Sequence, residues 1–109
     1  MPYEFISTAR EDAVGIITLN RPKVLNALNL QLVDEVVAEM ERLDQDPEIR
    51  VILLTGNEKA FAAGADIGEM ADPTAIEIMK RNQFAVWDRI ARISKPIVGA
   101  VSGFALGGG

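Results

Sequence analysis

Two short glycine-containing segments are the parts of this chain best suited to chemistry. The first is Ala63-Gly64-Ala65-Asp66, and the second is Gly107-Gly108-Gly109. Small residues let backbone N–H groups approach a ligand closely, and glycine adopts positive φ at little cost. Two such segments in one chain predict a site that polarises a carbonyl group through main-chain hydrogen bonds.

Each segment also has a purely structural interpretation. Glycines that follow a strand can simply allow a tight turn into a helix. The small residues of the first segment can pack beneath a helix, with Asp66 as its N-cap. The known phosphate-binding motifs do not fit, because no lysine follows the glycines and their spacing is not Gly-x-Gly-x-x-Gly.

The composition excludes several classes of active site and argues against some partners. The 109 residues contain no histidine and no cysteine, which excludes Ser-His-Asp and Cys-His catalysis and cysteine metal sites within them. We expect no metal site. The net charge of -5 argues against nucleic acid as a partner. The sequence has no apolar run near the ~18 residues of a membrane span and no signal-peptide pattern, so we expect a cytoplasmic protein with no membrane contact.

The hydrophobic pattern predicts one α/β domain over residues 1–109. Strands are predicted at residues 5–9 and 14–19 as a hairpin, with Gly15 as a candidate bulge. Apolar residues at helical spacing predict a helix from the N-cap Asn29 through Asp44. Continuous apolar runs at 51–55 and 97–101 predict parallel strands buried on both faces.

The remaining stretches complete the expected order β-β-α-β-loop-α-β. Residues 58–70 have no sustained period and predict a loop. Asp72 and Pro73 predict the start of a long helix, whose apolar stripe reaches Ile93 and comprises Ile76, Met79, Val86, Trp87, Ile90 and Ile93. The aromatic residues Phe61, Trp87 and Phe104 are expected in the core rather than in an acyl pocket.

Five segments, in order along the chain, resemble the enoyl-CoA hydratase/isomerase, or crotonase, superfamily. They are Ile17–Pro22, Leu25–Leu28, Ala60–Ile67, Lys95-Pro96 and Gly103–Gly109. The resemblance spans nearly the whole chain and is strongest to short-chain enoyl-CoA hydratases. It implies the N-terminal part of a crotonase-like spiral of β-β-α units, truncated after the strand that ends near Val101.

The resemblance implies an oxyanion hole made by the backbone N–H groups of Ala65 and Gly108, which would hold the thioester carbonyl of an acyl-CoA. No cofactor is implied, because the coenzyme A thioester is itself the substrate. Lys23 is a candidate phosphate contact, although a lone lysine is more often a solvated surface charge. Gly68 stands where related hydratases often carry a lysine, which leaves only a main-chain role there. The implied substrate and CoA contacts are Lys23, Val24, Leu25, Ala63, Ala65, Asp66, Ile67, Gly68 and Gly108.

The implied reaction is syn addition of water to a trans-2-enoyl-CoA, giving a 3-hydroxyacyl-CoA, in fatty-acid breakdown. Hydratases use two glutamates that would lie beyond Gly109, and Glu58, Asp66 and Glu69 do not match their positions. We therefore expect the chain alone to be inactive or nearly so. Two alternatives stay open: another acyl-CoA reaction of the superfamily, such as isomerisation or hydrolysis, and a non-catalytic acyl-CoA-binding fragment. The parent protein is expected to form homotrimers or homohexamers.

Overall fold

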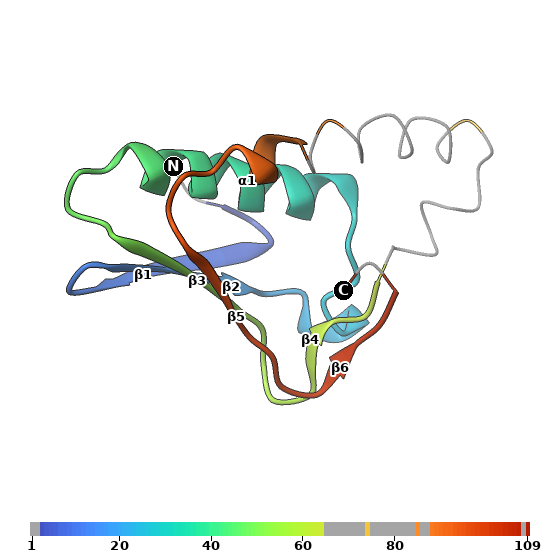
Figure 1. The fold of residues 1–109 in the computed structure, drawn as a ribbon. Coiled ribbons are helices and arrows are strands. Elements are labelled where there is room, and N and C mark those ends of the chain that lie inside the picture. The colour runs from blue at the N-terminus through green and yellow to red at the C-terminus, as the bar shows by residue number, and fades with distance from the viewer. Residues whose placement is uncertain (1–2, 65–73, 75–84, 86–87, 108) are drawn as a thin grey trace.

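The computed structural model describes residues 3–64, 74, 85, 88–107 and 109 (Figure 1). These residues form a four-stranded sheet, a two-stranded sheet and a long helix that covers the larger sheet. The elements are β1 (Ile6–Glu11), β2 (Val14–Leu19), the 3₁₀-helix η1 (Pro22–Val24), α1 (Leu30–Gln45), β3 (Val51–Thr55), β4 (Ala60–Ala62), β5 (Ile97–Ala100) and β6 (Phe104–Ala105). Among the described residues, the helices are too short or too polar to cross a membrane.

The larger sheet has the strand order β1-β2-β3-β5. β1 and β2 form the predicted antiparallel hairpin, although β1 continues to Glu11 rather than ending at Ala9. β3 pairs in parallel with both β2 and β5, as expected for strands joined by helical crossovers. The bounds predicted for β2 and β3 are confirmed.

The predicted bulge at Gly15 is wrong. Arg10 pairs directly with Gly15, and the register of the hairpin is regular on both sides of that pair. Packing favours glycine there, because a Cβ at this position would lie 2.6 Å from a methyl carbon of Leu43 on α1 and the leucine side chain would have to move. The glycine therefore lets the helix lie close to the sheet.

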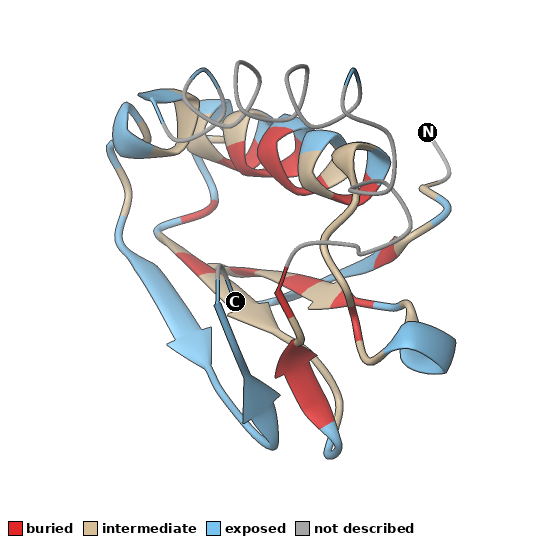
Figure 2. Ribbon diagram, turned by 90° about the vertical axis from the view of Figure 1, so that its right-hand side faces the viewer, coloured by how far each residue is buried: buried red, intermediate tan, exposed pale blue. Residues whose placement is uncertain are grey.

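The helix α1 supplies the apolar layer that covers the larger sheet (Figures 1 and 2). Asn29 is its N-cap, as predicted, and its side chain accepts a hydrogen bond from the Leu32 backbone N–H at 2.7 Å. One face of the helix is buried against the sheet because its apolar residues recur every three or four positions. The core contains Ile6, Ile17, Leu19, Leu32, Val36, Met40, Leu43, Ile49, Ile52, Phe61 and Ala62.

A buried carboxylate, Glu39, lies within this apolar face and is only 2% exposed. Its oxygens accept two hydrogen bonds from Arg42, at 2.8 and 2.6 Å, and one from the Tyr3 hydroxyl at 3.1 Å. A buried charge is tolerated when it is paired and hydrogen-bonded in this way. Helical spacing alone did not predict this buried carboxylate.

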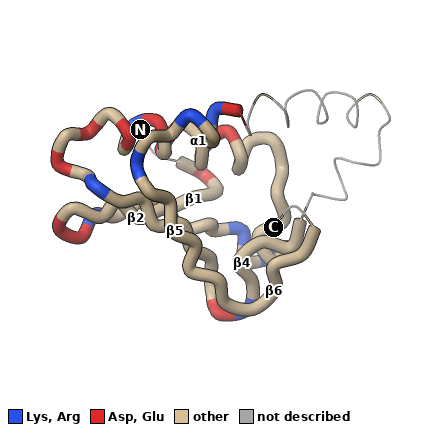
Figure 3. The backbone as a smooth tube through the Cα atoms, viewed as in Figure 1, with Lys and Arg blue, Asp and Glu red and all other residues tan. Residues whose placement is uncertain are grey.

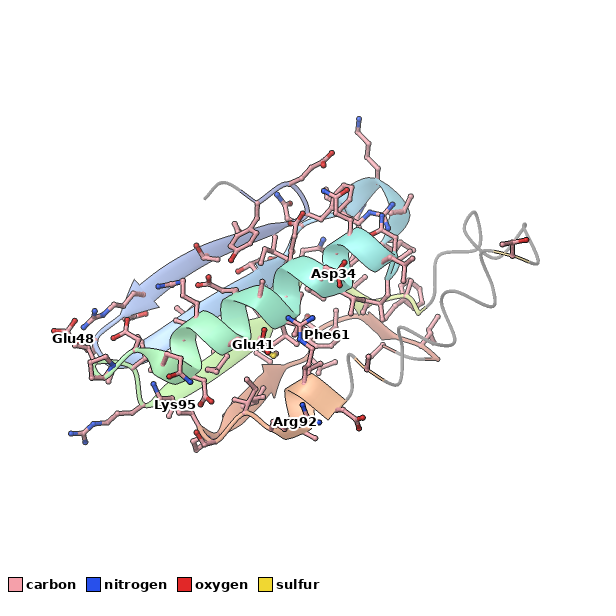
Figure 4. All side chains as sticks on the ribbon, turned by 90° about the horizontal axis from the view of Figure 1, so that it is seen from above. Asp34, Glu41, Glu48, Phe61, Arg92 and Lys95 are labelled. Carbon is pink, nitrogen blue, oxygen red and sulfur yellow. The ribbon has the colours of Figure 1, made fainter. Side chains whose placement is uncertain are left out.

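The C-terminal end of α1 is joined to the start of β5 by polar contacts. The Lys95 ammonium donates to the Leu43 and Asp46 carbonyls at 2.6 and 2.5 Å, which caps the end of the helix (Figure 4). The Asp44 carboxylate accepts from Ser94 and from the Lys95 backbone. Burial alone would raise the pKa of Asp44, but these hydrogen bonds outweigh it and lower that pKa.

The prediction that residues 97–101 form a strand buried on both faces is wrong in its burial. β5 is a strand, but every residue in it is exposed, including Val98 at 49%, and Figure 2 shows the whole strand in the exposed colour. The reason is that β5 lies at the edge of the sheet in the described part of the chain, paired only with β3. β3 itself is buried only at Ile52 and half-buried elsewhere.

Two short strands were not predicted. β4 interrupts the stretch expected to be a loop, and β6 lies just before the last glycines. They pair in parallel as a separate sheet, with Ala60 opposite Phe104 and Ala62 opposite Ala105. Strands this short show no hydrophobic periodicity, so only the pairing between distant segments identifies them.

Most of the predicted long helix from Asp72 falls outside the described residues, including Ile76, Met79, Val86 and Trp87. Residues 88–91 are helical, and Ile90 and Ile93 pack against the core as predicted. The Arg89 guanidinium pairs with the Glu41 carboxylate of α1 at 2.5 Å. The C-terminal end of this helix therefore lies against α1, which the sequence did not predict.

Candidate functional site

The two glycine-containing segments lie side by side, because β4 and β6 lead directly into them. The Leu106 backbone N–H donates to the Ala62 carbonyl at 3.1 Å. A Cβ placed on Gly107 would lie 4.0 Å from the Cα of Gly64. The predicted convergence of the two segments is thus seen in their described residues, whereas Ala65 and Gly108 themselves lie outside them.

Glycine is required at the point of closest approach. Gly64 has φ of +96°, and a Cβ there would lie 2.9 Å from the Leu106 carbonyl oxygen. Gly107 has φ of +52°, in the left-handed region that glycine adopts most readily. At Gly64 a side chain would therefore crowd the Leu106 carbonyl oxygen, whereas at Gly107 a Cβ would make only an ordinary contact and glycine is favoured by the backbone conformation.

A third segment, the turn Arg21–Leu28, lies along the opposite side of the Ala60–Gly64 segment. The Ala63 N–H donates to the Leu25 carbonyl at 3.1 Å, and the Leu28 N–H donates to the Gly64 carbonyl at 2.7 Å. Two of the predicted CoA contacts, Leu25 and Ala63, are thus hydrogen-bonded neighbours. The segment that precedes Ala65 is held between this turn and β6.

The other two predicted contacts on the turn, Lys23 and Val24, are exposed. Both belong to η1 and line an open surface depression with a volume of about 410 Å³. The depression is also lined by Glu4, Phe5, Asn20, Arg21 and Pro22. Lys23 is therefore accessible to a ligand, as a phosphate contact requires.

Arg21 has a structural role in this turn. Its guanidinium donates to the Ala27 carbonyl at 2.6 Å and lies 4.8 Å from the centre of the Phe5 ring. Its backbone N–H donates to the Asn26 side chain at 2.7 Å. These contacts close the turn and attach it to the chain just before β1.

Asn26 is the residue of this region that sequence reasoning missed. Its side chain is fully buried and hydrogen-bonded to the Ala60 and Phe61 carbonyls of β4, at 3.1 and 3.2 Å. Its φ is +56°, and asparagine tolerates this conformation better than most residues do. The signal in the sequence was a polar residue between Leu25 and Ala27, inside an otherwise apolar segment.

The aromatic residues divide between core and surface. Phe61 is buried at 8% exposure, as predicted, and is part of the core cluster. Phe104 is 52% exposed, so its predicted place in the core is wrong. β6 is paired only with β4 in the described part of the chain, which leaves the Phe104 ring uncovered. Trp87 lies outside the described residues.

The donors and acceptors around β4 and β6 are mainly main-chain groups. Neither strand contains a charged residue, and Figure 3 shows both without Lys, Arg, Asp or Glu colouring. The charged residues that precede β4 in the sequence, Glu58 and Lys59, are exposed. The described residues contain no group of three histidine, cysteine, aspartate or glutamate side chains that could hold a metal ion. The predicted contacts Asp66, Ile67 and Gly68, and the unmatched Glu69, lie outside the described residues.

Curated proteins of similar sequence are enoyl-CoA hydratases. A Mycobacterium tuberculosis protein, described as a probable enoyl-CoA hydratase, is 52% identical over 109 residues, which is 100% of this chain and 42% of that protein. The mitochondrial enoyl-CoA hydratase of Pongo abelii is 44% identical over 100 residues, covering 92% of this chain and 34% of that protein. The chain thus spans less than half the length of these relatives.

Solved structures of enoyl-CoA hydratases have the same fold over this length. The Geobacillus kaustophilus enoyl-CoA hydratase subunit matches with a TM-score of 0.87 and 53% identity, over 97% of this chain and 41% of that one. The Bacillus anthracis enoyl-CoA hydratase matches with a TM-score of 0.89 and 32% identity, over 97% of this chain and 43% of that one. The architecture is therefore the N-terminal part of the crotonase fold.

The family model of enoyl-CoA hydratase/isomerase matches residues 9–109, which include the paired glycine segments, the turn Arg21–Leu28 and most of the covered sheet. Sequence, fold and the arrangement around β4 and β6 all agree. The chain belongs to the enoyl-CoA hydratase/isomerase family.

Proposed function

We propose that this chain supplies the thioester-binding half of an enoyl-CoA hydratase. The observation that carries the proposal is the contact between Gly64 and Gly107, which brings together the segments that lead to Ala65 and Gly108. Family membership and the names of the relatives support the same substrate class, an acyl-CoA thioester.

The proposed reaction adds water across the double bond of a trans-2-enoyl-CoA. The water oxygen bonds to C3, one water proton leaves it, and a proton adds to C2 on the same face, giving a 3-hydroxyacyl-CoA. When oxygen attacks C3, the electron pair of the double bond moves towards the thioester, and negative charge develops on the carbonyl oxygen. A site that stabilises this oxygen lowers the barrier.

In this proposal, the backbone N–H groups of Ala65 and Gly108 donate to that oxygen. Main-chain donors fixed before substrate binds need no reorganisation during the reaction, and one such donor is worth roughly 10²–10³ in rate. The rest of the CoA lies along η1 and the segment after β4, where Lys23 is available for a phosphate. The proposed contacts are Lys23, Val24, Leu25, Ala63, Ala65, Asp66, Ile67, Gly68 and Gly108.

Isomerisation of an enoyl-CoA is the second candidate reaction. The matching family model covers both hydratases and isomerases. Both reactions place negative charge on the thioester oxygen, so the same pair of donors serves either one. The groups that add or remove protons decide between them, and each contributes typically about 10²–10⁴-fold. We propose that residues 1–109 alone catalyse neither reaction efficiently.

The test uses the complete gene product and crotonyl-CoA, with loss of the enoyl absorbance as the readout. Proline has no N–H, so Ala65→Pro and Gly108→Pro should each lower kcat by about 10²–10³. Ala65→Gly and Gly108→Ala keep the N–H and serve as matched controls. Full turnover in both proline variants would contradict the proposed donors. An isomerised product without hydration would favour the second candidate.

A further inference from the structure

Asn26 is a fully buried polar residue that the proposed reaction does not use. Its side-chain oxygen accepts from the Arg21 N–H at 2.7 Å. Its side-chain nitrogen donates to the Ala60 and Phe61 carbonyls at 3.1 and 3.2 Å. The oxygen faces a donor and the nitrogen faces two acceptors, so the orientation of the amide follows from its neighbours.

These hydrogen bonds connect parts of the chain that are 34 and 35 residues apart. On one side is the turn Arg21–Leu28, and on the other is β4, which leads to the proposed donor at Ala65. The same turn also binds the end of this segment through Leu25 and Leu28, whose partners are Ala63 and Gly64. Asn26 therefore holds the turn and the strand in one register.

Most of the main-chain carbonyl groups from Ala60 to Gly64 accept a hydrogen bond. Those of Ala60 and Phe61 accept from Asn26, that of Ala62 accepts from Leu106, and that of Gly64 accepts from Leu28 at 2.7 Å. In a planar trans peptide unit, the N–H points away from the carbonyl. The hydrogen bond from Leu28 to Gly64 therefore constrains the direction of the next N–H, which is the proposed donor.

We propose that Asn26 is a positioning residue for this donor. By locking the turn to β4, it places the Leu28 N–H where it orients the peptide unit after Gly64. Asn26 does not contact substrate, and the inference rests on the proposed function in taking that N–H as the donor. An error of about 1 Å in the position of such a group is enough to cost about 10²-fold in rate.

The first test is Asn26→Gly in the complete gene product. Glycine keeps the positive φ of this position, so the backbone conformation is retained while the side chain and its hydrogen bonds are lost. We expect kcat for crotonyl-CoA to fall about 10-fold to 100-fold, while KM changes little. If kcat stays at the wild-type value while the melting temperature falls, the role of Asn26 is only structural and the inference is wrong.

A spectroscopic readout separates positioning from loss of stability. Acetyl-CoA labelled with ¹³C at the thioester carbonyl can be bound to the protein and its carbonyl stretch measured by infrared difference spectroscopy. Directed donors should move this stretch to lower frequency in the wild type, and Asn26→Gly should reduce the displacement. An equal displacement in both proteins would overturn the inference.

Two further variants sharpen the test. Asn26→Asp has the same shape and still accepts from Arg21, but an ionised carboxylate cannot donate to the β4 carbonyls. It should lower kcat as well, and it carries the test if the glycine variant does not fold.

Asn57→Ala is the matched control, because Asn57 accepts from the Lys59 and Ala60 N–H groups at the other end of β4. It should lower stability and leave kcat and the carbonyl stretch unchanged, and an equal loss of kcat there would contradict a specific role for Asn26.

The failure of this inference differs from the failure of the proposed function. A wild-type protein that displaces the carbonyl stretch but does not hydrate crotonyl-CoA would overturn the proposed reaction, and the stretch would still decide the role of Asn26. A wild-type protein that neither binds acetyl-CoA nor displaces its stretch would overturn both.

Discussion

The sheet covered by α1 and the region around β4 and β6 are held together by different forces. Between the helix and the sheet, Ile17, Leu32 and Ile52 are at most 1% exposed and belong to one cluster of buried apolar side chains. The segment around β4 is joined to the turn Arg21–Leu28 by main-chain hydrogen bonds and by the Asn26 amide, and to β6 by main-chain hydrogen bonds.

This difference follows from what each region has to do. Hydrophobic burial is strong but has no preferred direction, so it suits a scaffold. Hydrogen bonds are weaker in net terms but fix the direction of each peptide unit, which a site built from N–H donors requires. We therefore expect substitutions under the helix to change stability, and substitutions near β4 to change turnover.

The largest expected loss of stability is in the covered sheet. Leu32→Ala removes a side chain that is 1% exposed, and such a cavity typically lowers the free energy of unfolding by about 2–5 kcal/mol. Denaturant unfolding of the complete gene product measures this loss. The kcat at 25 °C should stay close to wild type while the protein is folded, and a large drop in kcat would break the division between the two regions.

At the close approach of the two glycine-containing segments, Gly64→Ala should lower both the stability of the fold and kcat. Its φ of +96° is unfavourable for alanine, and the new Cβ would lie 2.9 Å from the Leu106 oxygen. This strain should lower the free energy of unfolding by about 1–3 kcal/mol. If β6 moves away to relieve the strain, the two segments separate and kcat should fall as well. Denaturation and the hydration assay together measure this, and lost stability with full kcat would show that the spacing of the two segments is not critical.

The helix cap gives a smaller, purely structural effect. Asn29→Ala removes the hydrogen bond to the Leu32 N–H and should lower the free energy of unfolding by about 1 kcal/mol. Asn29→Ser, which can still cap the helix, is the matched control and should recover most of the loss. Equal losses in the two variants would mean that the cap is not the cause.

The smallest expected effect is at the exposed ion pair between Arg89 and Glu41. The hydrogen bond from Arg89 lowers the pKa of Glu41 from its ordinary 4.5, against a smaller opposing effect of burial. The pair therefore stabilises the fold above about pH 4.5, and its contribution is lost as pH falls through the lowered value. Glu41→Gln should cost about 0.2–1 kcal/mol at pH 7, and less in high salt. A loss that is the same at pH 7 and pH 3 would contradict this origin.

The covered sheet could be predicted from the sequence because its signals are local. The hydrophobic pattern marked β2, helical spacing marked α1, and Asn29 marked the start of the helix. The errors arose where contacts between distant segments decide the outcome. The exposure of β5 follows from its pairing with β3 alone in the described part of the chain, and the close packing at Gly15 depends on Leu43.

The candidate site was predicted in part. The resemblance placed Leu25 and Ala63 along one CoA-binding groove, and the structure shows that they are hydrogen-bonded neighbours. Their contact with CoA stays a prediction. Asn26 was missed because its partners are two main-chain carbonyl oxygens on β4. Every residue has such a carbonyl group, so the sequence does not indicate which ones accept a hydrogen bond. The donors at Ala65 and Gly108 stay a prediction for the kinetic tests.

The sequence by itself determined the strands β2 and β3, the helix α1 and the presence of two glycine-containing segments, since each depends on the types and spacing of neighbouring residues. Only the tertiary structure decided that these segments lie against each other, that β4 and β6 pair, and that Asn26 joins β4 to the turn beside it. The physical reason is that main-chain hydrogen bonds between distant segments are the same for every residue type, so their partners are chosen by the fold.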